Sequence, residues 1–200
     1  MVDIEIERGP KARTRRLMLE TASRLMQDGV TPSVTEAAEA AGVSRATAYR
    51  YFPSQAALVQ AVVDEGLGPI LTWTSSSKNA EQRVDDLLAS SLPRIEAYEA
   101  TFKAALKLSL DQWARRKAGT LGDEERVKRG HRKELLKDAL SPLRGSLPPA
   151  QIDRLAQALS LVFGVEVMIV LKDIWGLDSI EMQSVARWMA TALVRASTDA

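Results

Sequence analysis

Residues 33–58, SVTEAAEAAGVSRATAYRYFPSQAAL, constrain the fold of this chain more than any other stretch. Ser33 is a typical N-cap, and Glu36 three residues later completes a capping box, so a helix is expected to start here. Gly42 favours a stop, because the turn that ends such a helix needs a positive φ. Ser44 then caps a new helix. The spacing predicts two short helices joined by a tight turn.

Pro53 and Ser54 mark the start of a third helix directly after the second. Proline disfavours α geometry in the residue before it, so the second helix is expected to close at Pro53. Ser54 caps the helix that follows, and Phe52 between them is expected to be part of the core. The three elements predict a helix–turn–helix whose second helix is short, exposed and polar at its start.

The same stretch resembles the DNA-binding signature of TetR-type transcriptional repressors. The resemblance covers about residues 13–58, near the N-terminus of a chain of the usual length for that family. A joined pattern of this kind is far more specific than helix–turn–helix spacing alone. The matching residues are Ala38, Ala41, Gly42, Val43, Ser44, Thr47, Tyr49, Tyr51, Phe52, Pro53 and Ser54.

The resemblance implies an all-α protein with two domains. Residues 1–55 would form the helix–turn–helix DNA-binding domain with an N-terminal arm, and residues 56–200 a larger helical domain for ligand binding and dimerisation. The implied function is that of a cytoplasmic homodimeric repressor, which binds a palindromic operator in double-stranded DNA. A small-molecule inducer, of unknown identity, would release it. No enzyme activity, cofactor or metal is expected.

The first turns of a recognition helix face base edges in the major groove, and here they carry Arg45, Ala46 and Thr47. Arg45 either binds a guanine, contacts a phosphate or faces solvent. By resemblance, Tyr49 matches the family's phosphate-binding tyrosine, whereas Gln55 stands where the family often has a phosphate-binding lysine. The expected DNA contacts are Ser33, Ser44, Arg45, Ala46, Thr47, Tyr49, Arg50, Tyr51 and Gln55.

Charge is distributed unevenly along the chain. The net charge is only +1, with 26% charged and 46% hydrophobic residues, which suits one or two globular domains with a real core. Residues 8–58, however, hold eight Lys or Arg against four Asp or Glu. A basic head on a near-neutral body fits the binding of a polyanion, although charge alone is more typical of a solvated surface.

Several classes of site are disfavoured by composition. The chain has no cysteine, which excludes disulfides and is compatible with a reducing cytoplasm. His131 is the single histidine, so neither a zinc site nor a histidine-based catalytic triad can be assembled convincingly. The start of the chain lacks a signal-peptide core, and no apolar run reaches the roughly 20 residues that a membrane span needs.

Hydrophobic periodicity predicts helices throughout the rest of the chain, with no strand and no repeat. Residues 1–12 look like a mobile arm. Pro93 is expected to break or restart a helix that Asn79 caps, and Asp178 or Ser179 is expected to cap the last helix. The further predicted helices cover residues 14–27 with Thr14 as N-cap, 123–140, and 150–174, the last being apolar nearly all round.

The last two helices carry more apolar surface than one subunit of this size easily hides. They could form a four-helix contact across a two-fold axis, or they could belong to an ordinary internal core. The dimer interface expected from this argument and from the resemblance consists of Leu155, Leu159, Val162, Val185, Trp188, Met189 and Ala192.

An apolar inducer pocket is a further expectation, with plain core packing as the alternative. Glu166 stands in a strongly apolar run, where a carboxylate is costly unless it is paired. It either recognises a cationic ligand or pairs with an Arg or Lys across the dimer. The expected pocket residues are Phe102, Leu106, Leu110, Trp113, Phe163 and Glu166, with Met168 nearby.

The run Gly66-Leu67-Gly68-Pro69 is expected to break or kink the helix that begins at Ser54. We take it as the candidate lever between the ligand pocket and the DNA-binding head. An alternative from another class is a helical module for protein interaction or small-molecule binding, whose head is only a packing remnant. The polar residues Arg45, Thr47 and Tyr49 argue against it, because a remnant has no need of them.

Overall fold

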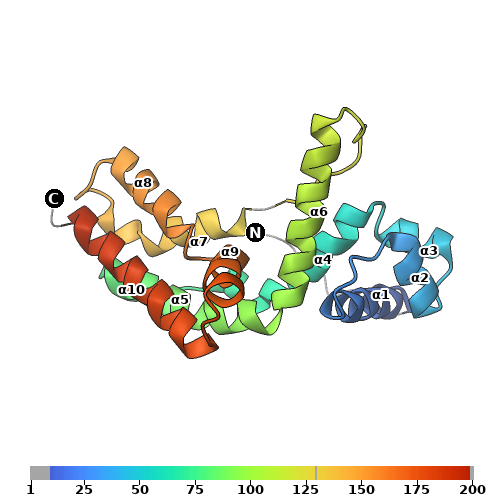
Figure 1. The fold of residues 1–200 in the computed structure, drawn as a ribbon, viewed down its shortest axis with the longest axis horizontal. Coiled ribbons are helices and arrows are strands. Elements are labelled where there is room, and N and C mark those ends of the chain that lie inside the picture. Colours follow the sequence, from blue (N-terminus) through green and yellow to red (C-terminus); the bar gives the residue numbers. More distant parts are fainter. Residues whose placement is uncertain (1–9, 129, 199–200) are drawn as a thin grey trace. The chain divides into compact units, whose positions relative to one another are not determined.

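The computed structural model describes residues 10–128 and 130–198, and within them it contains helices and no β-strand (Figure 1). The predicted all-α fold is confirmed. The chain forms two compact units: unit 1 contains the described residues up to Gly66 together with Tyr98–Lys128, and unit 2 contains Leu67–Ala97 together with the described residues from 130 on. The predicted division of function at residue 55 stays a prediction. None of the described helices is long and apolar enough to cross a bilayer.

In unit 1, the helix–turn–helix packs on α1. Met18, Ala22 and Met26 are fully buried. Helix α1 contacts α2 and α3, in which Ala37 and Ala48 are also fully buried, and such small side chains let helices approach closely. The helices of this unit are α1 (Pro10–Gln27), α2 (Val34–Ala41), α3 (Arg45–Tyr51), α4 (Gln55–Leu67) and α6 (Glu99–Lys117), of which α1, α2 and α3 form the blue group in Figure 1.

The start of α1 differs from the prediction. The helix begins at Pro10, so Thr14 lies inside it and is not the N-cap. Residues 10–12 are therefore helical, and of the predicted arm only residues 1–9 are left, which lie outside the described residues. The predicted interruption after α4 is confirmed: the helix ends at Leu67, and a 3₁₀ turn continues from Gly68, which has a φ of 40°.

The four predicted pocket residues of α6 do not form its buried face. The buried residues are mostly small or polar, with one leucine among them: Thr101, Ala104, Ala105, Leu108 and Gln112. The Thr101 hydroxyl accepts a hydrogen bond of 3.2 Å from Gln27 on α1. Small side chains let α6 pack closely on α1, so the large residues of the predicted stripe move outward: Phe102 and Leu106 are half-buried, and Leu110 and Trp113 are exposed.

Residues 123–128 are not helical, although a helix over 123–140 was predicted. Helix α7 covers only His131–Ala139. The backbone amides of the segment find partners on other elements: Val127 N–H donates to the Gln112 side chain on α6 and Lys128 N–H to the Gln60 side chain on α4, both at 3.0 Å. These long-range bonds replace the helical ones. Below, residues 123–128 are called the strap.

Unit 2 is built around the long helices α5 and α10. Helix α5 runs through Pro93, where a break was predicted, because Leu87, Leu92 and Ile95 on either side of the proline are buried in one continuous face. The Asn79 cap is confirmed by its bond from Gln82 N–H. The elements are η1 (Gly68–Thr72), α5 (Ala80–Ala97), α7 (His131–Ala139), η2 (Ser141–Leu143), α8 (Pro149–Leu159), α9 (Val165–Met168), the π-helical η3 (Ile169–Ile174) and α10 (Ser179–Thr198).

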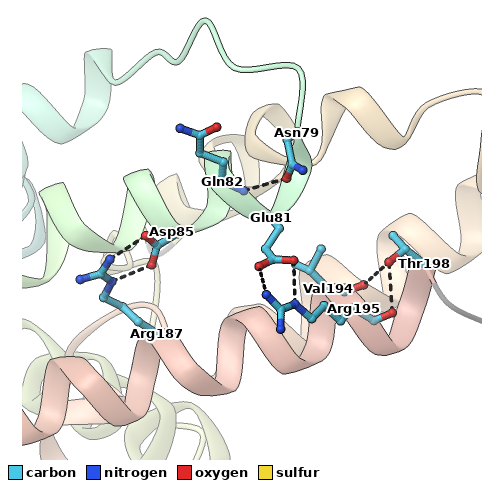
Figure 2. Close-up of polar contacts among 8 residues, drawn as sticks. All are labelled: Asn79, Glu81, Gln82, Asp85, Arg187, Val194, Arg195 and Thr198. Atoms are coloured by element: carbon cyan, nitrogen blue, oxygen red, sulfur yellow. Dashed lines mark hydrogen bonds and ion pairs between the residues drawn. The ribbon is translucent and has the colours of Figure 1, made fainter.

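Two bidentate ion pairs join α5 to α10 (Figure 2). Arg187 donates to both carboxylate oxygens of Asp85 at 2.6 Å, and Arg195 donates to both oxygens of Glu81 at 2.7 and 2.9 Å. The hydrogen bonds from Arg195 lower the pKa of Glu81, and those to Asp85 raise the pKa of Arg187. Asp178 caps α10, as predicted, by accepting from the backbone amides of the first turn.

The predicted helix over residues 150–174 is wrong, because it is broken between α8 and α9. Gly164 has a φ of 139°, which other residues rarely adopt, and a Cβ there would lie 2.8 Å from the side chains of Arg132 and Glu166. Arg132 donates to the Ser160 carbonyl at the end of α8 and to both carboxylate oxygens of Glu166, the shorter bond being 2.7 Å. Glu166 thus has an ion-pair partner in its own chain, and the expectation of a pairing across a dimer stays a prediction.

The predicted dimer residues divide into two groups. Leu155, Leu159 and Val162 are buried inside their own unit, which corrects their assignment to an intersubunit surface. Helix α10 turns a different stripe inward, consisting of Met182, Ala186, Ala190 and Val194. The predicted stripe of α10 faces away from this core: Val185 is half-buried, whereas Trp188, Met189 and Ala192 are exposed.

Candidate nucleic-acid interface

Helix α2 begins with the predicted capping box. Glu36 N–H donates to the Ser33 hydroxyl at 3.2 Å, and Ser33 N–H donates to the Glu36 carboxylate at 2.7 Å. The backbone bond from Ser33 lowers the pKa of Glu36. The start of α2 is therefore fixed by its own residues, with Ser33 half-buried at the helix end. Free amides at a helix N-terminus attract phosphate.

The turn between α2 and α3 depends on Gly42. Its φ of 64° is left-handed, and its amide and that of Val43 donate back to carbonyls of α2 at 3.2 and 2.9 Å. This is the glycine-terminated helix end that the sequence predicted. Because only residues 42–44 separate α2 from α3, the direction of α3 relative to α2 is set by this short turn.

Helix α3 is a short helix with one buried side and one exposed side. Ala48 and the following Phe52 are buried, and they anchor the helix on the unit 1 core. Ser44 caps it by accepting from Thr47 N–H at 3.3 Å, and the Ser44 hydroxyl also donates to the Thr47 hydroxyl at 2.9 Å. On the outer side Arg45, Ala46, Tyr49 and Arg50 are exposed, while Thr47 and Tyr51 are half-buried.

Arg45 is held by an acid of the preceding helix. Its guanidinium lies 2.5 Å from the carboxylate of Glu39 on α2, and both side chains are well exposed. An exposed pair of this kind contributes only about 0–1 kcal/mol, so it can be exchanged for another acidic partner. Glu39 is a residue that the sequence analysis missed. Its signal was available, since it is the last acid before the turn that brings α2 and α3 together.

The two tyrosines of α3 have defined surroundings. The Tyr49 hydroxyl lies 3.3 Å from the Thr35 hydroxyl on α2, at hydrogen-bond distance. The guanidinium of Arg50 lies 5.3 Å from the centre of the Tyr51 ring, in cation–π geometry. Thr35 was also missed, because only the folded turn brings it opposite Tyr49. The hydrogen bond between the Thr35 and Tyr49 hydroxyls is exposed to solvent.

Gln55 has a structural role in the unbound protein. Its amide nitrogen donates to the carbonyls of Thr31 and Pro32 at 3.1 and 3.2 Å, which ties the start of α4 to the loop before α2. A contact between Gln55 and a phosphate would have to replace these bonds. A lysine at this position could not reproduce them with the same planar amide geometry.

The predicted pocket residues belong to both units. Phe102, Leu106, Leu110 and Trp113 lie on α6 in unit 1, whereas Phe163 and Glu166 lie in unit 2 around the α8–α9 break. Glu166 is engaged by Arg132. A cavity shared by all six stays a prediction. Trp113 lines a separate cavity within unit 1, which is described below.

Comparisons with known proteins agree with this geometry. The family profile described as bacterial regulatory proteins, tetR family, matches residues 19–62, which include α2 and α3 and most of α1 and α4. The chain is 39% identical over 62 residues to the HTH-type transcriptional repressor LfrR of Mycolicibacterium smegmatis, a match that covers 31% of this chain. It spans 33% of that relative's length.

The likeness in fold extends over nearly the whole chain. A crystal structure of a TetR transcriptional regulator from Rhodococcus sp. RHA1 superposes with a TM-score of 0.59, covering 93% of this chain and 97% of that one. The sequence identity is 18%, so this likeness concerns the fold. It supports an N-terminal helix–turn–helix domain followed by a helical body.

Proposed function

We propose that the chain, whose residues 19–62 match the tetR family of bacterial regulatory proteins, is a homodimeric repressor of that type, which binds a palindromic DNA operator and is released by a small-molecule inducer. The observation that supports this most is the exposed side of α3, with Arg45, Ala46 and Tyr49 on a helix anchored by buried Ala48 and Phe52. A short helix with this division of faces suits insertion into the major groove.

The proposed roles follow from what each side chain can offer. Arg45 reaches guanine O6 and N7 and gives up Glu39 when it does so, a step that exchanges a carboxylate for two acceptor atoms of a base. Tyr49 donates its hydroxyl to a phosphate, leaving Thr35. Ser33 and Ser44, at the starts of α2 and α3, bring helix N-termini to the backbone. Thr47, Arg50, Tyr51 and Gln55 flank these contacts.

Dimerisation is supported by the exposed apolar surface of unit 2. Trp188 is 70% exposed on the outer face of α10, and Trp175 and Ile174 at the end of η3 are each 72% exposed. Monomeric proteins rarely expose several large apolar residues close together in one region. We propose that Trp188, Met189 and Ala192 meet their copies across a two-fold axis. The two DNA-binding domains of the dimer would then bind half-sites about 34–36 Å apart.

Selection of duplexes from a random pool tests the DNA-binding part of the proposal. Wild type should select a palindrome. Arg45→Ala should relax one symmetric pair of positions, at a cost of about 1–3 kcal/mol per site. Tyr49→Phe should weaken all sequences alike, because a phosphate contact carries no sequence information. Failure of wild type to select any sequence, with equally weak binding by all three proteins, would overturn the repressor proposal.

Sedimentation of Trp188→Glu tests the dimer. A charge in the centre of an apolar contact should shift the protein to a monomer at micromolar concentration, because an unpaired buried charge is costly. Leu110→Glu is the matched control, since Leu110 is similarly apolar and 56% exposed but lies on α6 in unit 1. A dimer that survives in Trp188→Glu would place the interface elsewhere.

A further inference from the structure

Unit 1 contains a cavity of about 510 Å³ between α6 and the strap. This volume falls in the range of about 300–1,000 Å³ that is typical of small-molecule sites. Half of its wall comes from one face of α6 and half from the strap. The lining residues are Ser109, Gln112, Trp113, Arg116, Glu125, Arg126, Val127 and Lys128.

Gln112 holds the two walls together. Its side chain is buried, with 3% of the residue exposed, and all of its polar atoms are used. The amide nitrogen donates to the Glu125 carbonyl at 2.9 Å and to the Glu124 carboxylate at 3.3 Å, while the amide oxygen accepts from Val127 N–H at 3.0 Å. One buried side chain therefore keeps the non-helical strap at a fixed distance from α6.

The charges of the cavity favour an anion. Arg116, Arg126 and Lys128 line it, and within the described parts of the chain no hydrogen bond or ion pair engages the charged ends of these three side chains. The single acid of the lining is Glu125, whose carboxylate accepts from the Ser54 hydroxyl at 2.8 Å. Three cations against one engaged carboxylate leave the cavity with uncompensated positive charge.

The apolar part of the lining favours a flat group. Trp113 is 53% exposed at the cavity wall, although an indole normally packs its faces against other groups. It stands three residues before Arg116 on α6, so both side chains project from the same face of the helix. A molecule that stacks on Trp113 would thus carry its anionic group toward Arg116 and the strap cations.

The strap also contacts α4, the helix that follows the recognition helix. Ser54, which precedes α4, donates to Glu125, and Gln60 on α4 accepts from Lys128 N–H at 3.0 Å. Recognition helix α3 ends at Tyr51, only a few residues before Ser54. Any shift of the strap that opens the cavity must lengthen or break these bonds, so the cavity and the start of α4 are mechanically linked.

We propose that this cavity binds a small organic anion with a flat apolar body, and that its binding displaces the strap from α4 and weakens DNA binding. The second half of this statement rests on the proposed function. Selection of an anion follows from Arg116, Arg126 and Lys128, and selection of a flat body from Trp113. Glu125 and Gln60 transmit the displacement.

Calorimetric titration of the full chain with 2-naphthoate tests the ligand class, with uncharged 2-naphthylmethanol as the comparison. The carboxylate should bind at least about tenfold more tightly, since a charge-assisted hydrogen bond is worth about a factor of ten or more. Arg126→Gln and Trp113→Leu should each weaken naphthoate binding about tenfold. Lys117→Gln, an exposed cation of α6 outside the lining, should leave it unchanged. Equal binding of both probes, no binding, or equal loss in Lys117→Gln would overturn the site.

A second measurement tests the link to DNA. Saturating 2-naphthoate should weaken operator binding several-fold in wild type. Gln60→Met keeps the shape of the side chain but removes the acceptor for Lys128, so it should keep naphthoate binding and lose most of the effect on DNA. An effect that persists in Gln60→Met, or no effect in wild type, would overturn the link. If the unliganded protein selects no DNA sequence, the repressor proposal fails, and calorimetry still decides the ligand class.

Discussion

The helix–turn–helix and the α5–α10 pair are stabilised by contacts of very different sequence separation. In the first, Ser33 bonds Glu36, Ser44 bonds Thr47, and Arg45 pairs with Glu39, all within a few residues. In the second, Arg187 and Arg195 pair with acids more than 100 residues earlier in the chain (Figure 2). The head is specified locally, whereas unit 2 depends on residues that only folding brings together.

Two glycines offer the largest test of this difference. Gly164→Ala should destabilise the protein by about 3 kcal/mol, because the substitution imposes backbone strain at a φ of 139° and pushes a Cβ against Arg132 and Glu166. Gly42→Ala should cost only about 1–2 kcal/mol, since its φ of 64° is left-handed but nothing lies within 4 Å. Urea unfolding of both variants measures the two costs, and equal values would contradict the comparison.

The ion pairs of unit 2 should have a smaller effect. Asp85→Asn removes the carboxylate charge to which Arg187 donates two hydrogen bonds. It should lower the free energy of unfolding by only about 1 kcal/mol, because both side chains are partly exposed. Thermal unfolding at low and at high salt checks this. The deficit should shrink at high salt, and the double exchange Asp85→Arg with Arg187→Asp should recover part of it. A loss of stability that does not change with salt concentration would indicate that Asp85 contributes through packing and not through its charge.

Acid should destabilise unit 2 before it disturbs the head. Burial alone would raise the pKa of Glu96, but hydrogen bonds from Lys172 and Ser179 outweigh it and lower that pKa, as Arg195 lowers the pKa of Glu81. Lowered carboxyl pKa values contribute stability that is complete above about pH 4.5, the ordinary value, and is lost as pH falls through the lowered values. In the head, the bonds with Ser33 lower the pKa of Glu36, so protonation there loosens the capping box at the start of α2.

Unfolding between pH 6 and pH 3, followed by hydrogen exchange, checks this expectation. Protection in α5 and α10 should fall first, and Glu81→Gln should flatten the pH dependence in that range. Simultaneous loss of protection in α2 and α10 would show that the two regions unfold as one.

The smallest effect is expected at Glu39. Glu39→Gln should raise affinity for mixed-sequence DNA about two- to threefold, because it frees Arg45 and removes one acid from the DNA-facing surface. Filter binding at low salt measures this, and Glu20→Gln on α1 is a control, since Glu20 pairs with Arg16 outside the helix–turn–helix. Lower affinity in Glu39→Gln would mean that the pair orients Arg45 for DNA.

The same contrast explains which features the sequence predicted. Caps and stops depend on neighbours in the chain, so Ser33, Gly42 and Ser44 were placed correctly, as was the Asn79 cap of α5. The break after α8 was missed because it depends on Arg132, which lies nearly thirty residues before Ser160. In the candidate site, Thr35 could not be predicted as a partner of Tyr49, because only the folded turn brings the two hydroxyls together.

The buried face of α6 and the non-helical conformation of the strap were not predicted, for a related reason. A stripe of large apolar residues usually indicates the core, but α6 packs through Thr101, Ala104 and Ala105, and the larger Trp113 faces the cavity. Periodicity reports which residues share a face, whereas the closeness of the neighbouring helix decides which face is buried. The backbone bonds of the strap depend on Gln112 and Gln60, which belong to two different helices.

The composition of unit 1 has a practical consequence for dissection of the chain. Its core is discontinuous in sequence, because about thirty residues of unit 2 separate α4 from α6. Helix α6 packs on α1, and Gln27 donates a hydrogen bond to Thr101. A fragment cut after Gly66 would retain every candidate DNA contact, yet it would expose the α1 surface that α6 covers. An autonomous head would need α6 grafted onto the end of α4 through a short linker, with α5 left out.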